Sequence, residues 1–272
     1  MNHLICTYGA AQSGKTTSCT AFYGYYLTSL GIIPNANFDE SGRMSVIYNK
    51  KTNEGIYFDI DDDSPSMIEF KQKNIWPHIK HVSFADALKE SIIKLFGVKR
   101  ELIYGSNDDK NTFTNIQWDD AFPFLTQERA IKLEHKSGTN LTIRELCQVF
   151  GTDICRAFDS DCHLKSAVNA LAIDKPSIGF CPDGRFDNEF LFFDKPEAKS
   201  LLRNTKVWRV KFTRNSSTHN PPGEQGLPEI DESLYDLVIH NKVLTVLEKN
   251  EIFINFFIEK GVLPKSGVSR TV

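Results

Sequence analysis

An octapeptide near the start of the chain constrains its fold more than any other feature. Residues 9–16 read Gly-Ala-Ala-Gln-Ser-Gly-Lys-Thr and match the pattern G-x-x-x-x-G-K-[ST] at every defined position. A short apolar run, residues 4–8, precedes the motif, and the proline-free segment 15–30 follows it. A strand, a glycine loop and a helix in this order predict an α/β fold in which the loop wraps an anion.

Each position of the motif has a chemical reason. The glycines let the backbone curl, so that several N–H groups point at one phosphate, and the following helix adds the positive end of its dipole. The lysine reaches the terminal phosphates and the threonine hydroxyl holds Mg²⁺. We therefore expect a nucleoside-triphosphate site made by Gly9, Gln12, Ser13, Gly14, Lys15, Thr16 and Thr17. The chain has no N-K-x-D guanine signature, which argues against a GTPase.

The composition is that of a globular protein, and the net charge limits the classes of binding partner that we expect. The chain has 272 residues, of which 40% are hydrophobic, so it can bury a substantial core. The net charge of −3 does not favour generic affinity for nucleic acid. We see no apolar run long enough to cross a membrane and no export signal. The six cysteines form no C-x-x-C pair, so a reducing cytoplasm is the expected setting.

Strand and helix patterns alternate along the chain. We expect strands at 4–8, 81–84, 177–181, 206–212 and 236–240, and helices at 15–30, 85–96, from Thr142, from 160 or 161 to 173, and at 243–258. This order predicts a mostly parallel sheet covered by helices on both faces. Residues 97–141 appear loop-like, and Gly151 is expected to end a helix. The expected organisation is one domain, 1–272, with a hairpin insertion at 40–75.

If the nucleoside-triphosphate site belongs to a kinase, the protein must also hold a phosphate acceptor. The transferred phosphoryl group carries charge that arginines and Mg²⁺ neutralise. Several arginines stand beside predicted strand or helix ends, where a site can gather them: Arg144, Arg156, Arg185 and Arg214. For any one arginine alone, a solvated surface position is the commoner situation.

Short motifs follow the loop in a fixed order over nearly the whole chain. Their sequences are Phe84-Ala85-Asp86-Ala87-Leu88-Lys89-Glu90, Leu95-Phe96-Gly97 with Tyr104-Gly105 and Lys110-Asn111, Thr142-Ile143-Arg144-Glu145-Leu146, Phe150-Gly151-Thr152-Asp153, Gly184-Arg185-Phe186-Asp187-Asn188-Glu189, and finally Arg214, Thr218-His219 and Glu224-Gln225-Gly226-Leu227. Together with the loop, this series resembles the phage deoxynucleoside monophosphate kinases, a branch of the P-loop nucleotide kinases. The F-G-T-D and G-R-F-x-N-E pieces are the most specific, because the loop is common to many enzymes.

The resemblance implies a three-layer α/β/α P-loop kinase. Its implied activity is transfer of the γ-phosphoryl group of ATP to a deoxynucleoside 5′-monophosphate (dNMP), with Mg²⁺, in the cytoplasm of the host cell. Lys15, Arg185 and Asp183 are the expected catalytic residues, and Thr16 with Asp183 the expected metal ligands. Arg214 is expected to close over ATP. The expected acceptor residues are Lys89, Arg144, Gly151, Thr152, Asp153 and Arg156.

Some features depart from the family and leave alternatives open. His163 stands where the family often has Trp, and residues 220–223 lengthen the closing segment, so base preference is open. One alternative keeps the fold but phosphorylates a hydroxymethylated pyrimidine within DNA, which requires a basic channel for the strand. Another alternative is a nucleotide-dependent binding module with negligible turnover, although the arginine set argues against it. Monomer and homodimer are both compatible with the sequence.

Overall fold

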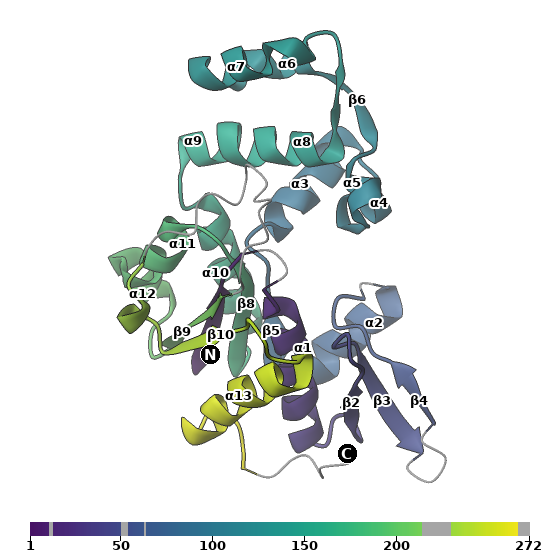
Figure 1. The fold of residues 1–272 in the computed structure, drawn as a ribbon, viewed down its shortest axis with the longest axis vertical. Helices are drawn as coiled ribbons and strands as arrows, with labels where there is room; N and C mark the ends of the chain where they lie inside the picture. Colours follow the sequence, from purple (N-terminus) through teal and green to yellow (C-terminus); the bar gives the residue numbers. More distant parts are fainter. Residues whose placement is uncertain (11–12, 50–53, 63, 214–229, 266–272) are drawn as a thin grey trace. The chain divides into compact units, whose positions relative to one another are not determined.

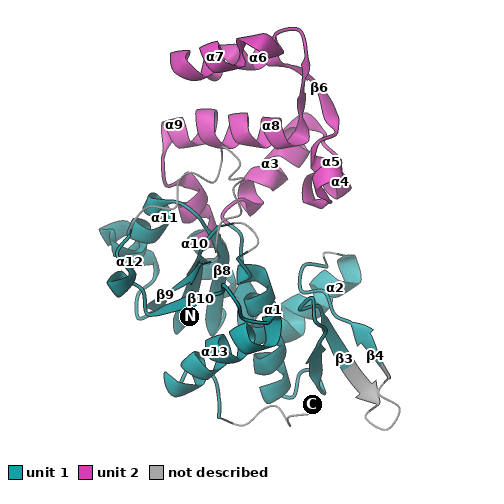
Figure 2. Ribbon diagram, in the orientation of Figure 1, with its two compact units in different colours: residues 1–83, 168–272 teal, residues 84–167 magenta. Residues whose placement is uncertain are grey.

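The computed structural model describes residues 1–10, 13–49, 54–62, 64–213 and 230–265. Contacts within these ranges divide the chain into two compact units (Figure 2). Unit 1 combines residues 1–83 with 168–272, and unit 2 comprises residues 84–167. The sequence analysis treated residues 1–272 as one domain. The structure shows a middle segment, 84–167, with a set of internal contacts of its own.

A parallel sheet of five strands organises unit 1 (Figure 1). Its strands are β1 (His3–Tyr8), β5 (Ile79–His81), β8 (Ile178–Gly184), β9 (Lys206–Thr213) and β10 (Leu237–His240). The order across the sheet is β10-β9-β1-β8-β5, with every pair parallel. The predicted α/β class and parallel sheet are confirmed. The strand expected at 81–84 is instead β5, which begins at Ile79 and ends at His81.

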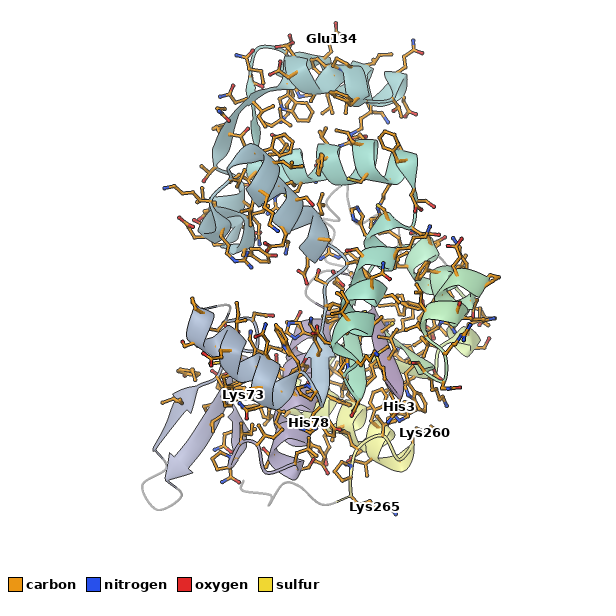
Figure 3. The ribbon with its side chains drawn as sticks, turned by 180° about the vertical axis from the view of Figure 1, so that it is seen from behind. His3, Lys73, His78, Glu134, Lys260 and Lys265 are labelled. Atoms are coloured by element: carbon orange, nitrogen blue, oxygen red, sulfur yellow. The ribbon has the colours of Figure 1, made fainter. Side chains whose placement is uncertain are left out.

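Side chains alternate between the two faces of this sheet, and helices cover both. On one face, Phe180 packs against Phe22 of α1 (Lys15–Ser29) and Phe253 of α13 (Val246–Glu259), with ring centroids 5.7 and 6.1 Å apart. On the other face, the backbone at Gly179 lies close to Leu171 of α10 (Cys162–Asp174). At the start of β1, seen from behind in Figure 3, His3 Nδ1 accepts a hydrogen bond from the Trp208 indole (3.2 Å).

A small antiparallel sheet completes unit 1. It consists of β2 (Ala36–Phe38), β3 (Met44–Asn49) and β4 (Glu54–Tyr57), in that order. β3 pairs antiparallel with β4, as the pattern of residues 44–60 predicts, and β2 is an unexpected third strand. The helix α2 (Pro65–Phe70) and the π-helical turn η1 (Lys71–Ile75) follow.

Unit 2 contains structure where the sequence analysis expected a loop. The expectation for residues 97–141 is wrong, because Ile103, Trp118 and Leu141 are buried there in a core of their own. Apolar residues are sparse in this segment and its helices are short, so no periodic signal stands out. The elements of unit 2 are α3 (Asp86–Phe96), α4 (Arg100–Tyr104), α5 (Asn107–Lys110), β6 (Phe113–Gln117), α6 (Trp118–Ala121), η2 (Phe122–Phe124), α7 (Gln127–Leu133), η3 (Glu134–Lys136), β7 (Asn140–Thr142), α8 (Ile143–Gln148), η4 (Val149–Cys155) and α9 (Arg156–Phe158).

The helix that begins after Thr142 also differs from expectation at its far end. The predicted start at Thr142 is confirmed by a capping box, in which the Glu145 amide donates to Thr142 Oγ1 (3.2 Å) and the Thr142 amide donates to Glu145 Oε2 (2.8 Å). Gly151 does not end the helix, because the chain continues as the π-helix η4. A Cβ at Gly151 would lie 2.6 Å from Leu88 Cδ2. The glycine is therefore needed for close packing rather than for a stop.

The remaining short elements of unit 1 lie in its C-terminal half. They are α11 (Asp187–Leu191), η5 (Phe192–Asp194), α12 (Pro196–Leu201) and η6 (Glu232–Leu234). Among the residues that the structure describes, no helix is both long and apolar enough to cross a bilayer.

The core of unit 2 can be tested by a matched pair of substitutions. Leu141 is 0% exposed in that core, whereas Ile131 is 66% exposed. Leu141→Ala should lower the free energy of unfolding by about 2–5 kcal/mol, because it leaves a cavity. Ile131→Ala should change it by less than about 0.5 kcal/mol. Urea unfolding of both variants measures the difference, and equal effects would contradict this core.

Candidate functional site

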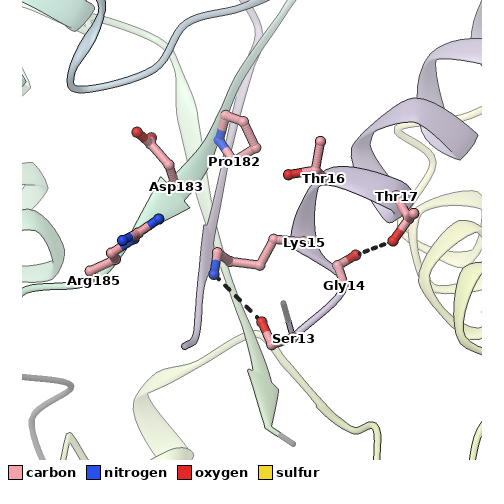
Figure 4. A pocket seen from close by; sticks show the side chains of 8 residues that line it. All are labelled: Ser13, Gly14, Lys15, Thr16, Thr17, Pro182, Asp183 and Arg185. Atoms are coloured by element: carbon pink, nitrogen blue, oxygen red, sulfur yellow. Dashed lines mark hydrogen bonds between the residues drawn. The ribbon is translucent and has the colours of Figure 1, made fainter. Parts of the chain in front are cut away.

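A cavity of about 310 Å³ lies where the loop at residues 9–16 meets the end of β8 (Figure 4). β1 and β8 are adjacent and parallel, so their carboxyl ends reach the same edge of the sheet, where open α/β sheets bind ligands. The cavity gathers residues that are about 170 positions apart in sequence. Its lining is Ser13, Gly14, Lys15, Thr16, Thr17, Pro182, Asp183 and Arg185. The predicted catalytic and metal-binding residues therefore share one cavity.

The two glycines of the motif have conformations that other residues rarely adopt. Gly9 has a φ of 149° and Gly14 a φ of 97°. A Cβ at Gly9 would lie 2.4 Å from the Phe212 carbonyl oxygen. The tight curl of this loop therefore depends on glycine, as expected from the motif.

Lys15 is bonded to the loop itself. It is only 6% exposed, and its Nζ donates to the carbonyl oxygens of Gly9 (2.5 Å) and Ala10 (2.7 Å). Ser13 Oγ lies 3.5 Å from the same ammonium group (Figure 4). A buried ammonium needs such acceptors, because burial of an unpaired charge is costly. The positive charge is thus held at the cavity, where an incoming anion can compete for it.

Asp183 is oriented by a residue that the sequence analysis missed. Ser83 Oγ, just beyond β5, donates to Asp183 Oδ2 (2.5 Å). Because β5 pairs in parallel with β8, the segments after both strands leave the same edge of the sheet. The predicted strand at 81–84 contains Ser83, and only the observed end of β5 at His81 shows that Ser83 lies beyond the strand.

Arg185 is placed by a second missed residue, Glu189. The backbone N–H groups of Arg185 (2.6 Å) and Phe186 (3.0 Å) both donate to Glu189 Oε2. Glu189 is only 3% exposed, and its carbonyl oxygen accepts from the Tyr8 hydroxyl (3.2 Å). The buried carboxylate fixes the turn that carries Arg185 at the cavity. Its place four residues after the arginine, at the start of a helix, was a readable capping signal.

The donor set at the cavity fits Mg²⁺ bound together with a nucleotide. The Thr16 hydroxyl and the Asp183 carboxylate line the same cavity. Mg²⁺ in nucleotide sites takes one or two protein oxygens, with phosphate and water oxygens as its other ligands. In the described ranges, no group of three or more His, Cys, Asp or Glu residues has the arrangement of a metal site. An ion held mainly by protein ligands would need such a group, whereas a nucleotide-bound ion does not.

Three cations gather separately in unit 2. Lys89 of α3 places its ammonium 4.5 Å from the centre of the Tyr104 ring. Arg144 of α8 donates to the side-chain oxygens of Asn107 (2.8 Å) and Asn111 (3.4 Å), which flank Lys110 of α5. Lys89 and Arg144 were predicted acceptor residues. Lys110 belongs to the motif series that resembles the family, but it was not among the predicted acceptor residues.

The charges in this cluster affect one another. Burial lowers the pKa of Lys110 most, and repulsion from Lys89 and Arg144 lowers it further, while Cys147 and Asp109 act weakly in the opposite direction. The same three cations counteract the burial that raises the pKa of the Cys147 thiol. We call Lys89, Lys110 and Arg144 the cation cluster. Crowded positive charges oriented by neutral partners favour the binding of an anion.

The other predicted acceptor residues lie on or beside the π-helix η4. Asp153 forms an ion pair with Arg129 (2.7 Å), and its side chain is only 5% exposed. Burial raises the pKa of Asp153, and Arg129 partly offsets this. Gly151 packs against Leu88, Thr152 is exposed and Arg156 is half-buried. Gly151 and Asp153 therefore take part in packing and ion pairing within unit 2.

Two predicted residues cannot be placed, and the comparisons add no family. Gln12 and Arg214 lie outside the described residues. Comparison of the chain with models of known protein families finds no match, and neither does comparison with curated proteins.

The burial of His163 predicts that the stability of the protein depends on pH. The ring is 9% exposed, its Nε2 lies 3.2 Å from the Gly151 carbonyl oxygen, and burial lowers its pKa below 6.5. Below pH 6.5 the His163 imidazole therefore binds a proton more readily in the unfolded chain than in the folded chain. As a result, the free energy of unfolding falls as the pH drops.

We expect His163→Gln to flatten the fall in the free energy of unfolding between pH 7 and 5. Glutamine keeps an N–H donor but does not titrate. Urea unfolding at several pH values measures this slope, with the exposed His135→Gln as the control. An unchanged slope in His163→Gln would contradict the assignment.

Proposed function

We propose that the protein is a kinase that transfers the γ-phosphoryl group of ATP to a dNMP, producing the diphosphate. One observation carries the proposal: the cavity at the carboxyl edge of the sheet collects the motif lysine with Thr16, Asp183 and Arg185. The ordered motifs that resemble the phage dNMP kinases support the same activity. The sheet order, with the loop-bearing strand between β8 and β9, supports a three-layer P-loop kinase fold.

The residues of this cavity have complementary roles in phosphoryl transfer. Lys15 exchanges its loop carbonyls for phosphate oxygens and follows the transferring group. Arg185 adds a second positive charge, which matters most where charge develops in the transition state. Ser83 holds the Asp183 carboxylate in a single orientation. Mg²⁺, when bound with ATP beside Thr16 and Asp183, would neutralise phosphate charge.

The cation cluster is the proposed site of the acceptor phosphate. A monophosphate ester is close to a dianion at neutral pH, and the three cations of the cluster, of which Lys89 and Arg144 are held by neutral groups, match it. The guanidinium of Arg144 suits this task because its planar fork binds two phosphate oxygens at once. Asn107 and Asn111 hold that fork in place.

A second cavity of about 230 Å³ lies beside the loop and shares Gly14 and Thr17 with the first cavity. Its lining is mainly polar, from Thr17, Asn241, Lys242 and Lys249, and Leu244 and Val246 add apolar side chains. A sugar and base attached to a phosphate in the loop would meet both kinds of group there, so we propose this cavity as the place of the nucleoside.

A panel of acceptors tests the proposed activity directly. The protein is incubated with γ-labelled ATP and each of the four ordinary dNMPs, 5-hydroxymethyl-dUMP, or hydroxymethylated DNA. We expect label on at least one dNMP, with activity that persists at moderate salt because few phosphates are contacted. Label on the polymer alone would favour the DNA-modifying alternative, and label on none would favour the binding module.

Lys15→Ala tests the donor side. Loss of one electrostatic contact to the transferring group typically lowers kcat by about 10²–10³. We expect a loss of this size in steady-state assays. Lys199→Ala, at an exposed lysine of α12 in the same unit, should leave kcat unchanged. Turnover of Lys15→Ala within threefold of the wild type would overturn the donor site.

Lys110→Ala and Arg144→Lys test the acceptor side. Loss of one phosphate contact of about 1.4 kcal/mol should raise the dNMP KM about tenfold, with the ATP KM nearly unchanged. Lys132→Ala, at an exposed lysine of the same unit, is the control. Parallel changes in both KM values, with a lower Tm, would instead indicate a structural role. An unchanged dNMP KM in both variants would remove the cation cluster from the site.

A further inference from the structure

A buried lysine on the last helix contacts the loop from outside the motif. Lys249 of α13 is 1% exposed and lies along the same helix as the buried Phe253 and Phe257. Its Nζ donates to the Gly14 carbonyl oxygen (3.1 Å) and to Thr17 Oγ1 (2.7 Å). Burial of a lysine in an apolar stripe is costly. The contact therefore calls for an explanation.

The C-terminal segment holds two consecutive carbonyls of the loop. Asn241, just after β10, donates from Nδ2 to the Ser13 carbonyl oxygen (3.0 Å). Lys249 bonds the next carbonyl, that of Gly14, which also accepts from Thr17 Oγ1 (2.8 Å). Two side chains distant in sequence from the motif thus help to hold two of its peptide planes, and the Ser18 amide (3.1 Å) also bonds the Gly14 carbonyl.

The geometry of the peptide unit turns these contacts into an effect on the cavity. In a planar trans peptide, the C=O and the following N–H point in opposite directions. The carbonyls of Ser13 and Gly14 are held toward the C-terminal segment. The N–H groups of the same two peptide units, those of Gly14 and Lys15, therefore point away from that segment. Backbone N–H groups oriented together in this way form an anion-binding concavity.

Gly14 itself is matched to the lysine. A Cβ at this position would lie 2.4 Å from Lys249 Nζ. The φ of 97° favours glycine here, and a larger residue would also displace the Lys249 ammonium from the loop.

We propose that Lys249 is a positioning residue for the loop. Its ammonium group holds the Gly14 peptide and the Thr17 hydroxyl, so that the loop is shaped for a polyphosphate before one binds. Asn241 does the same for the preceding peptide. The identity of the ligand rests on the proposed function, whereas the shaping of the loop does not.

Lys249→Met tests this role, because methionine keeps most of the apolar stem and removes the ammonium. Lys71→Met is the matched control. Lys71 is also buried (7% exposed) and donates to backbone carbonyls, those of Ile60 and Asp62, away from the loop. Both variants should lose stability. Only Lys249→Met should weaken binding of ATP and of inorganic tripolyphosphate, by about tenfold or more. Lys249→Arg should restore part of the affinity.

A measurement without ligand separates this inference from the proposed function. The Ser18 amide donates to the same Gly14 carbonyl (3.1 Å), so amide exchange in residues 13–22 should be faster in Lys249→Met than in Lys71→Met. Failure of the wild type to bind either polyphosphate would overturn the proposed function, and the exchange comparison would still decide the role of Lys249. Equal exchange in the two variants would overturn the positioning role.

Discussion

The candidate site depends on how the backbone of one glycine loop is held. Gly9 and Gly14 give the loop its curl, but glycines alone leave a chain free to adopt other shapes. Hydrogen bonds remove that freedom. Lys15 bonds the carbonyls at the start of the loop, and Asn241 and Lys249 bond those at its end. A loop restrained at both ends loses little conformational entropy when an anion binds, which favours affinity.

The parallel sheet brings the second half of the cavity to this loop. Asp183 lies near the end of β8 and Arg185 directly follows that strand, and because β8 pairs with β1, both residues reach the cavity at the loop. Neither side chain is positioned by the strand alone. Ser83 bonds the carboxylate of Asp183, and Glu189 holds the turn that carries Arg185. These bonds hold the charges in place for the proposed phosphoryl transfer, a reaction in which positioning and electrostatics supply most of the catalysis.

Unit 2 contains two different arrangements of charged side chains, the cation cluster and a buried ion pair. The cation cluster is held by an aromatic face and two asparagine side chains, which orient the charges of Lys89 and Arg144 without neutralising them. Elsewhere in the unit, Asp153 meets Arg129 in an ion pair that is largely buried. The two arrangements differ in what they leave available. The ion pair gives the buried Asp153 carboxylate a partner charge, whereas the cluster retains positive charge for a ligand such as the proposed acceptor phosphate.

The sequence by itself determined the local features of this protein. The motif around Gly14, the capping box at Thr142 and the alternation in β9 each depend on neighbours within a few residues, so they can be read directly from the chain. Residues 97–141 could not be read, because Ile103, Trp118 and Leu141 become a core only when distant short elements meet. The contact of Lys249 with the loop spans 235 residues. Only the tertiary structure decided such pairings, because no local pattern encodes which distant backbone carbonyl a buried side chain will meet.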